Sequence, residues 1–224
     1  MSEFDAILFD AGGVLVLPDP TVIGPLLAPY GGDPGVDAHR RAHYAAMAAK
    51  SHARDDEADW DAYNVTYVEA VGVEAALLEH AAEVLDRTRT AHLWRWPIPE
   101  TARALQALAE RDLPMGVVSN ASGQIADMLR LTRICQAGDG PHISMRVIVD
   151  SHVVGVAKPD PRIFEFALSS FAEFDRGRIA YVGDSVVMDV GGASAAGLLP
   201  ILLDPYDDHA GADFLRVRSV EDLL

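Results

Sequence analysis

The chain has little cysteine, little positive charge and no long apolar segment. A single cysteine among 224 residues excludes an internal disulfide and favours a reducing compartment. The 18 Lys and Arg residues face 34 Asp and Glu, and the net charge of −16 repels nucleic acid and anionic membrane surfaces. No window approaches about 18 uninterrupted apolar residues, and the N-terminus lacks the pattern of a secretory signal. We therefore expect a cytoplasmic monomer or homodimer that binds neither nucleic acid nor a membrane.

Half of the residues are hydrophobic, which is enough for a large core. Short, continuously apolar runs, typical of strands buried on both faces, alternate with helical patterns in the second part of the chain. This alternation predicts an α/β fold with a doubly wound parallel sheet, whose strands all end at one edge. The five runs lie at 6–11, 115–121, 146–151, 179–185 and 199–204.

Residues 17–95 interrupt the alternation. We predict no comparable strand there, and Ala-rich helical patterns run through 39–56 and 61–89. The expected organisation is therefore a core made of residues 1–16 and 96–224 with a small helical domain, 17–95, inserted after the first strand. The segment 135–145 has the Gly, Asp and Pro content of an expanded loop.

Two polar sites follow predicted strands. Asp10 ends the run LFD and precedes two glycines, which allow a sharp turn and the close approach of a ligand. A carboxylate in this place suits nucleophilic catalysis, although it also suits an ordinary glycine turn. Ser119 and Asn120 close the run MGVVSN before a predicted helix, where they suit either phosphate binding or helix capping.

A lysine and an acidic pair follow later in the chain. Lys158 is one of only two lysines beside 16 arginines, and its compact charge suits a crowded anionic site as well as a solvated loop. Asp184 and Asp189, in GDSVVMD, lie at a strand-to-helix junction. With Asp10 they offer the oxygen ligands that Mg²⁺ prefers, although helix capping is the alternative.

Asp10, Ser119, Lys158 and the pair Asp184 and Asp189 resemble, in order and context, the four motifs of the haloacid dehalogenase-like superfamily. The resemblance covers about residues 4–16 and 97–205, and the helical insertion looks like the cap domain of that family. It implies that Asp10 is the nucleophile and that Ser119, Asn120 and Lys158 bind the transferring group.

The same resemblance implies a Mg²⁺ site. Its ligands would be Asp10, the Gly12 carbonyl, Asp184 and Asp189, the last directly or through the outer shell. The implied activity is Mg²⁺-dependent hydrolysis of a small phosphate ester through an aspartyl-phosphate intermediate. Positioning and charge neutralisation carry most of such phosphoryl transfers.

Gly12 departs from the family pattern, because phosphatases of this family have a second Asp there as general acid and base. The leaving group needs little help, or a residue of the insertion supplies the proton, with His39, His43 and Asp19 as candidates. We expect these three side chains to lie on the surface. A 2-haloacid dehalogenase and a weakly catalytic phospholigand-binding module are further alternatives.

A phosphonate-cleaving enzyme remains another alternative, because such relatives combine a small residue at this position with a cap lysine that forms a Schiff base. Lys50 is the only lysine of the insertion, and we expect it to be solvated on its helix. Trp60, Tyr63 and Tyr67 are expected to be packing residues rather than a substrate pocket.

Overall fold

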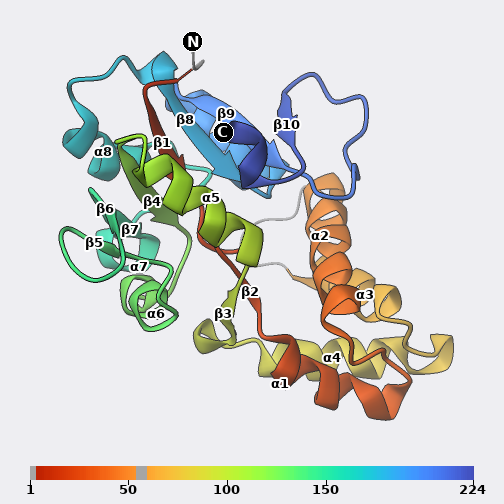
Figure 1. Ribbon diagram of the computed structural model, residues 1–224. Helices are drawn as coiled ribbons and strands as arrows, with labels where there is room; N and C mark the ends of the chain where they lie inside the picture. Colours follow the sequence, from red (N-terminus) through yellow and green to blue (C-terminus); the bar gives the residue numbers. More distant parts are fainter. Residues whose placement is uncertain (1–3, 54–59) are drawn as a thin grey trace.

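The computed structural model describes residues 4–53 and 60–224. Its centre is a six-stranded sheet in which every neighbouring pair is parallel, in the order β10-β9-β8-β1-β4-β7 (Figure 1). The five predicted strands are all present, which confirms the doubly wound α/β fold. A sixth strand, β10, was not predicted. The strands are β1 Ala6–Phe9, β4 Met115–Ser119, β7 Ile148–Asp150, β8 Ile179–Gly183, β9 Leu199–Leu203 and β10 Leu215–Val217.

Helices cover both faces of this sheet, which explains why its strands are apolar without alternation. Residues of α5 and α6 join one buried cluster with Ile7 and Phe9, whereas residues of α8 and α9 join a second cluster with Ala6 and Leu8. Successive residues of β1 thus point to opposite helical layers. The helices outside the insertion are α5 Pro99–Ala109, α6 Ile125–Leu131, α7 Ser151–Val154, α8 Arg162–Leu168 and α9 Gly192–Ala195.

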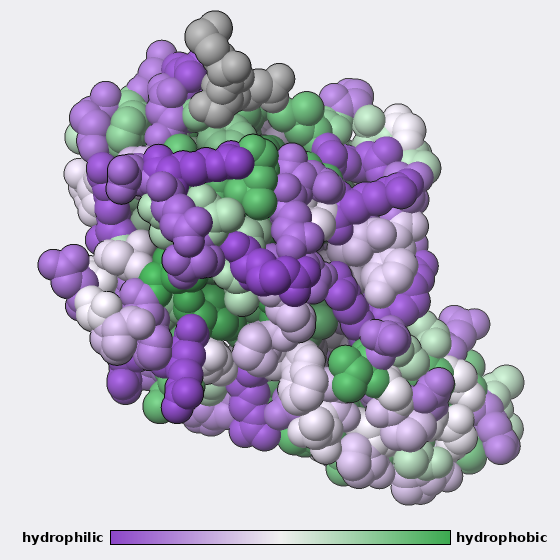
Figure 2. All heavy atoms as spheres, viewed as in Figure 1, coloured by the Kyte–Doolittle hydropathy of each residue, from purple (hydrophilic) through white to green (hydrophobic). Residues whose placement is uncertain are grey.

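The insertion forms a separate helical lobe below the sheet in Figure 1. Its helices enclose a third apolar cluster, which contains Ile23, Met47, Tyr63 and Leu85. Figure 2 shows hydrophilic residues over much of the face in view, with a paler surface on this lobe. The helices are α1 Pro20–Leu27, α2 Val36–Ala53, α3 Asp61–Ala70 and α4 Leu78–Thr88. Residues 54–56 of the predicted helical stretch 39–56 lie outside the described residues.

The expectation that the insertion contains no strand was wrong at its two ends. Strands β2 (Val16–Pro18) and β3 (Trp94–Pro97) pair antiparallel where the chain leaves and re-enters the core. Both are too short and too rich in proline and tryptophan to show a periodic pattern. The domain boundaries at 16/17 and 95/96, which fall within this ribbon, remain a prediction.

The expanded loop predicted at 135–145 is also partly a sheet. Strands β5 (Cys135–Ala137) and β6 (Ile143–Met145) pair in parallel, and Cys135 and Met145 are buried against the helices α5 and α6. Three-residue strands carry too little pattern to be distinguished from a loop in the sequence. No helix among residues 4–53 and 60–224 is long and apolar enough to cross a membrane.

Candidate active site

The carboxyl ends of the central strands bring the predicted residues together. Asp10 directly follows β1, Ser119 is the last residue of β4, and Asp184 directly follows β8. Because these three strands are neighbours and parallel, their ends meet at one edge of the sheet, where ligands of open α/β folds bind. The sequence prediction that these positions share one edge is confirmed.

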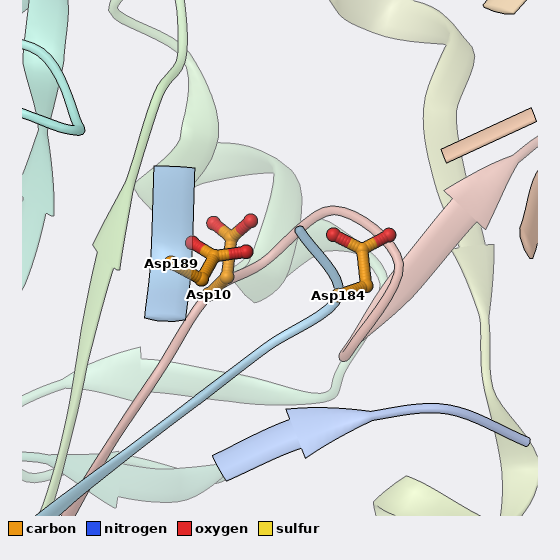
Figure 3. A group of neighbouring side chains, drawn as sticks. All are labelled: Asp10, Asp184 and Asp189. Atoms are coloured by element: carbon orange, nitrogen blue, oxygen red, sulfur yellow. The ribbon is translucent and has the colours of Figure 1, made fainter. Parts of the chain in front are cut away.

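Asp189 reaches the same edge through a π-helical segment, Val186–Gly191. Its carboxylate turns back to accept a hydrogen bond from the Ser185 N–H at 2.9 Å. A Cβ atom on Gly183 would stand 2.1 Å from Asp189 Cγ, so only glycine fits at the end of this strand. Figure 3 shows the carboxylates of Asp10 and Asp189 together, with that of Asp184 across from them.

A cavity of about 390 Å³ lies at this edge. On the core side, all the residues that the sequence assigned to the site line it. They are Asp10, Gly12, Ser119, Asn120, Lys158, Asp184 and Asp189. The insertion contributes the opposite wall, which includes Met47, Lys50, Trp60, Arg89 and Thr90. The cavity therefore lies between the two parts of the chain.

Lys158 occupies the centre of the charged cluster. Its ammonium lies 3.0 Å from Asp10 Oδ1 and 2.6 Å from Asp189 Oδ1. It also donates a hydrogen bond at 2.8 Å to the Tyr181 hydroxyl, which in turn donates to the Val118 carbonyl. Lys158 is only 2% exposed, so water does not screen these interactions.

The cluster contains more negative than positive charge. Burial raises the pKa of Asp10 to about 7, although Lys158 and a hydrogen bond from Ser119 lower it. Burial also raises the pKa of Asp184 above its usual value. For Lys158, burial lowers the pKa, but the two adjoining carboxylates outweigh it and raise the pKa above the ordinary value. Three carboxyl groups and one ammonium would leave a buried negative excess if all of them were ionised.

A divalent cation would offset this excess. One oxygen from each of Asp10, Asp184 and Asp189 lies within 4.8 Å of the others. Such an all-oxygen donor set fits Mg²⁺, which binds through a few carboxylates and keeps several waters. The residues present therefore fit the predicted metal.

The side chain of Asn120, predicted to bind phosphate, is hydrogen-bonded to the backbone of Lys158. Its side-chain amide donates to the Lys158 carbonyl at 3.0 Å and accepts from the Lys158 N–H at 2.8 Å. This pair of bonds fixes the backbone that carries the central lysine. Asp150, at the end of β7, similarly accepts from the N–H groups of Gly123 and His152, so it orders loops beside the cavity.

The indole ring of Trp94, from the insertion, lies against Gly12. An ideal Cβ atom on Gly12 would lie 3.2 Å from Cζ3 and 3.3 Å from Cε3 of Trp94. Ordinary contacts begin near 3.4 Å. A side chain at this position would therefore press on the indole ring, which would have to shift by a few tenths of an ångström.

The expectation that His39, His43 and Asp19 lie on the surface was wrong, because their exposed fractions are 2%, 1% and 6%. Asp19 binds Thr21 and Arg95, and His39 contacts the Tyr67 hydroxyl. Their patterns resemble those of surface positions, but a helix of a small bundle also turns polar residues inward when partners are available. Among these three, His43 contacts the acidic cluster, at 3.0 Å from Asp184 Oδ2.

The expectation that Lys50 is solvated was also wrong. Lys50 is 5% exposed, lines the cavity, and places its ammonium 4.3 Å from the centre of a Trp60 ring. Trp60 therefore belongs to the cavity wall, contrary to its expected role in packing alone. Tyr63 and Tyr67 are buried in the apolar cluster of the insertion, as expected.

Tyr181 and Trp94 are among the residues of the site that sequence reasoning missed. Tyr181 is the one side chain with a hydroxyl in the strand IAYVG, and this exception within an apolar run was a signal for a buried polar partner. Trp94 had no such signal, because its contact with Gly12 depends on the pairing of β2 with β3.

Comparisons with known proteins agree with this geometry. A haloacid dehalogenase-like hydrolase family profile matches residues 4–197, and the chain belongs to this family of hydrolases. The chain is 33% identical to a phosphoserine phosphatase of Thermus thermophilus over 135 residues, which cover 58% of this chain and 51% of that protein. A second relative is a pyrimidine 5'-nucleotidase of Escherichia coli, with 31% identity over 110 residues, 49% of this chain and 46% of that one. The chain spans about half the length of these curated relatives.

Solved structures share the fold. A phosphatase of the same superfamily from Thermococcus onnurineus has a TM-score of 0.60 and 21% identity, covering 98% of this chain and 95% of that one. A 2-haloacid dehalogenase from Pseudomonas syringae has a TM-score of 0.55 and 21% identity, with coverage of 98% and 96%. Enzymes named for two different chemistries therefore share this architecture.

Proposed function

We propose that this hydrolase is a Mg²⁺-dependent phosphatase that acts on a small phosphorylated metabolite. The observation that carries the proposal is the meeting of the Asp10, Asp184 and Asp189 carboxylates, two of which, Asp10 and Asp189, contact Lys158. The phosphatase names of several relatives support it. Displacement of a halide from carbon would not require so many carboxylates at one point, whereas phosphoryl transfer uses a divalent cation, which three carboxylates can hold.

In this proposal Asp10 attacks the phosphorus atom and forms an aspartyl-phosphate intermediate while the ester oxygen departs. Lys158 holds the carboxylate of Asp10 in place and offers positive charge to the transferring oxygens. Ser119 orients the phosphoryl group, and Asn120 fixes the backbone that carries Lys158. When bound by Asp10, Asp184, Asp189 and the Gly12 carbonyl, Mg²⁺ would supply the remaining neutralising charge.

The protonation of the leaving group sets the range of substrates. Gly12 has no side chain, so no carboxylate donates a proton from there. Leaving groups that are stable as anions are therefore favoured, because they need little general acid catalysis. The cytoplasmic location and the monomeric or dimeric state remain predictions.

The test is the hydrolysis of 4-nitrophenyl phosphate with and without Mg²⁺, for the wild-type chain and for Asp10→Asn. We expect activity only with the cation and a loss of at least about 10³-fold in the variant, because the nucleophile is removed. Full activity of Asp10→Asn would remove Asp10 as the nucleophile. Chloride release from a 2-haloacid without Mg²⁺, and no phosphate release, would establish dehalogenase chemistry instead.

The burial of Lys50 favours a second candidate, the cleavage of a carbonyl-bearing phosphonate. Lys50 lines the cavity, and the neutral amine of a lysine can condense with a carbonyl, releasing water. The resulting iminium would accept the electron pair of the carbon–phosphorus bond as the phosphoryl group moves to Asp10. Trapping by borohydride with a phosphonoaldehyde, measured by mass at Lys50, tests this route. The absence of a reduced adduct would exclude it.

A further inference from the structure

Helix α2 links the insertion to the core at several points. Arg40 pairs with Glu100, Arg41 binds both carboxylate oxygens of Asp208 at 2.7 and 2.6 Å, and the Ser51 hydroxyl accepts from the Val186 N–H. Between these contacts along α2, two consecutive residues reach the loops that follow β1 and β8. The Tyr44 hydroxyl donates to the Gly13 carbonyl at 2.7 Å, and His43 Nε2 lies 3.0 Å from Asp184 Oδ2.

His43 is held in a fixed orientation. Its Nδ1 lies 2.9 Å from the Tyr63 hydroxyl, and its ring packs edge-on against Tyr44, Tyr63 and Trp94. The side chains of His43 and Asp184 are 1% and 4% exposed. A carboxylate only accepts hydrogen bonds, so Nε2 is the donor to Asp184.

From this geometry we infer that His43 is a positioning residue that joins the helical insertion to the metal site. It fixes one oxygen of Asp184 and thereby orients the carboxylate toward the cation. The same bond makes cation binding favour the arrangement in which α2 packs on the core. The inference rests on the proposed function in one respect, because it takes Asp184 as a metal ligand.

Two features support this role over simple packing. An apolar ring would fill the space between Tyr44, Tyr63 and Trp94 as well, but it would leave Asp184 without its partner from α2. The two residues are 141 positions apart and come from different parts of the fold. Partners of this kind, in contact with a ligating group, typically contribute about 10- to 100-fold to metal affinity.

The chain contains a matched control one turn earlier on the same helix. His39 is also buried, and its Nδ1 lies 2.9 Å from the hydroxyl of Tyr67, as that of His43 does from Tyr63. His39 has no contact with Asp184. His39→Phe therefore removes an equivalent buried imidazole without touching the metal site.

The experiment measures Mg²⁺ affinity by calorimetry on the full chain, without substrate. We expect His43→Phe to weaken binding by about 10- to 100-fold, His43→Gln to recover much of it because its amide can donate, and His39→Phe to match the wild type. Equal affinities for His43→Phe and His39→Phe would overturn the inference and leave the phosphatase proposal intact. A wild-type chain that binds no Mg²⁺ would overturn both.

A gentler pair of variants covers the case in which His43→Phe does not fold. Tyr63→Phe removes the hydroxyl that orients His43, and Tyr67→Phe removes its counterpart at His39. We expect Tyr63→Phe alone to weaken Mg²⁺ binding. Hydrogen exchange in α2 provides a second readout, since Mg²⁺ should slow it in the wild type and not in Tyr63→Phe. No effect of Mg²⁺ on α2 in the wild type would contradict the link.

Discussion

Adding at Gly12 the carboxylate that the family resemblance implies tests the phosphoryl-transfer reasoning directly. A positioned general acid and base contributes about 10²- to 10⁴-fold to turnover, which is about 3 to 5 kcal/mol of barrier. Gly12→Asp alone should recover only part of this, because the new Cβ would lie 3.2 Å from Cζ3 of Trp94. Crowding of this kind costs about 1 to 3 kcal/mol, and a displacement of about 1 Å can cost 10²-fold.

Replacing the Trp94 indole by a smaller ring should recover the remaining gain in turnover. In Gly12→Asp/Trp94→Phe the carboxylate has room, and we expect turnover of an alkyl phosphate to rise by about 10²-fold or more over Trp94→Phe. 4-Nitrophenyl phosphate should gain much less, because its leaving group departs without a proton. Gly12→Ala reports the crowding without the carboxyl group.

The assay is steady-state phosphate release from both esters with saturating Mg²⁺, with the melting temperature of each variant measured beside it. A folded double variant that hydrolyses the alkyl phosphate no faster than Trp94→Phe would refute the reasoning. It would mean that the proton comes from elsewhere or that phosphoryl transfer is not the reaction.

Three further results are expected. Lys158→Met should lower the free energy of unfolding by about 3 to 5 kcal/mol, because two carboxylates lose a buried partner. A loss of under about 1 kcal/mol in urea unfolding would contradict the burial of this charge. In metal-free protein the pKa of Asp10 is raised, so its neutral form contributes fully to the free energy of unfolding below about pH 4. This contribution is lost as pH rises through about 7. Unfolding in EDTA should therefore show wild type losing stability relative to Asp10→Asn over that interval, and parallel curves would exclude the shift. Gly13→Ala should lower the free energy of unfolding by about 1 to 3 kcal/mol and weaken Mg²⁺ binding in calorimetry. The reason is that φ of Gly13 is +70° and the new Cβ would lie 1.8 Å from Asp184 Oδ2. Unchanged affinity would argue against this loop geometry.

The core and its half of the site could be predicted because their signals are local. Asp10, Ser119 and Asp184 each follow a continuous apolar run, and parallel strands necessarily gather such ends at one edge. Lys158 and Asp189 then followed from their place in the family motifs. The geometry brings all of these residues to one cavity, while their catalytic roles stay predictions.

The insertion's half of the site could not be read in the same way. The spacing of His39 and His43 places both on one side of a helix, but periodicity does not say whether that side meets solvent, another helix or the core. The burial of Lys50 depends on Trp60, which belongs to another segment of the chain. The β2–β3 ribbon decides where Trp94 lies, and its strands are too short to be recognised.

This ribbon also has a consequence for how such a protein can change over generations. Both crossings between the core and the helical lobe run through two strands that are hydrogen-bonded to each other, so the lobe starts and finishes at nearly the same place. A different set of helices can be exchanged there without altering the strand order of the sheet or the positions of the residues at the carboxyl ends of its strands. The insertion and the core can therefore diversify separately, except where α2 contacts Gly13 and Asp184.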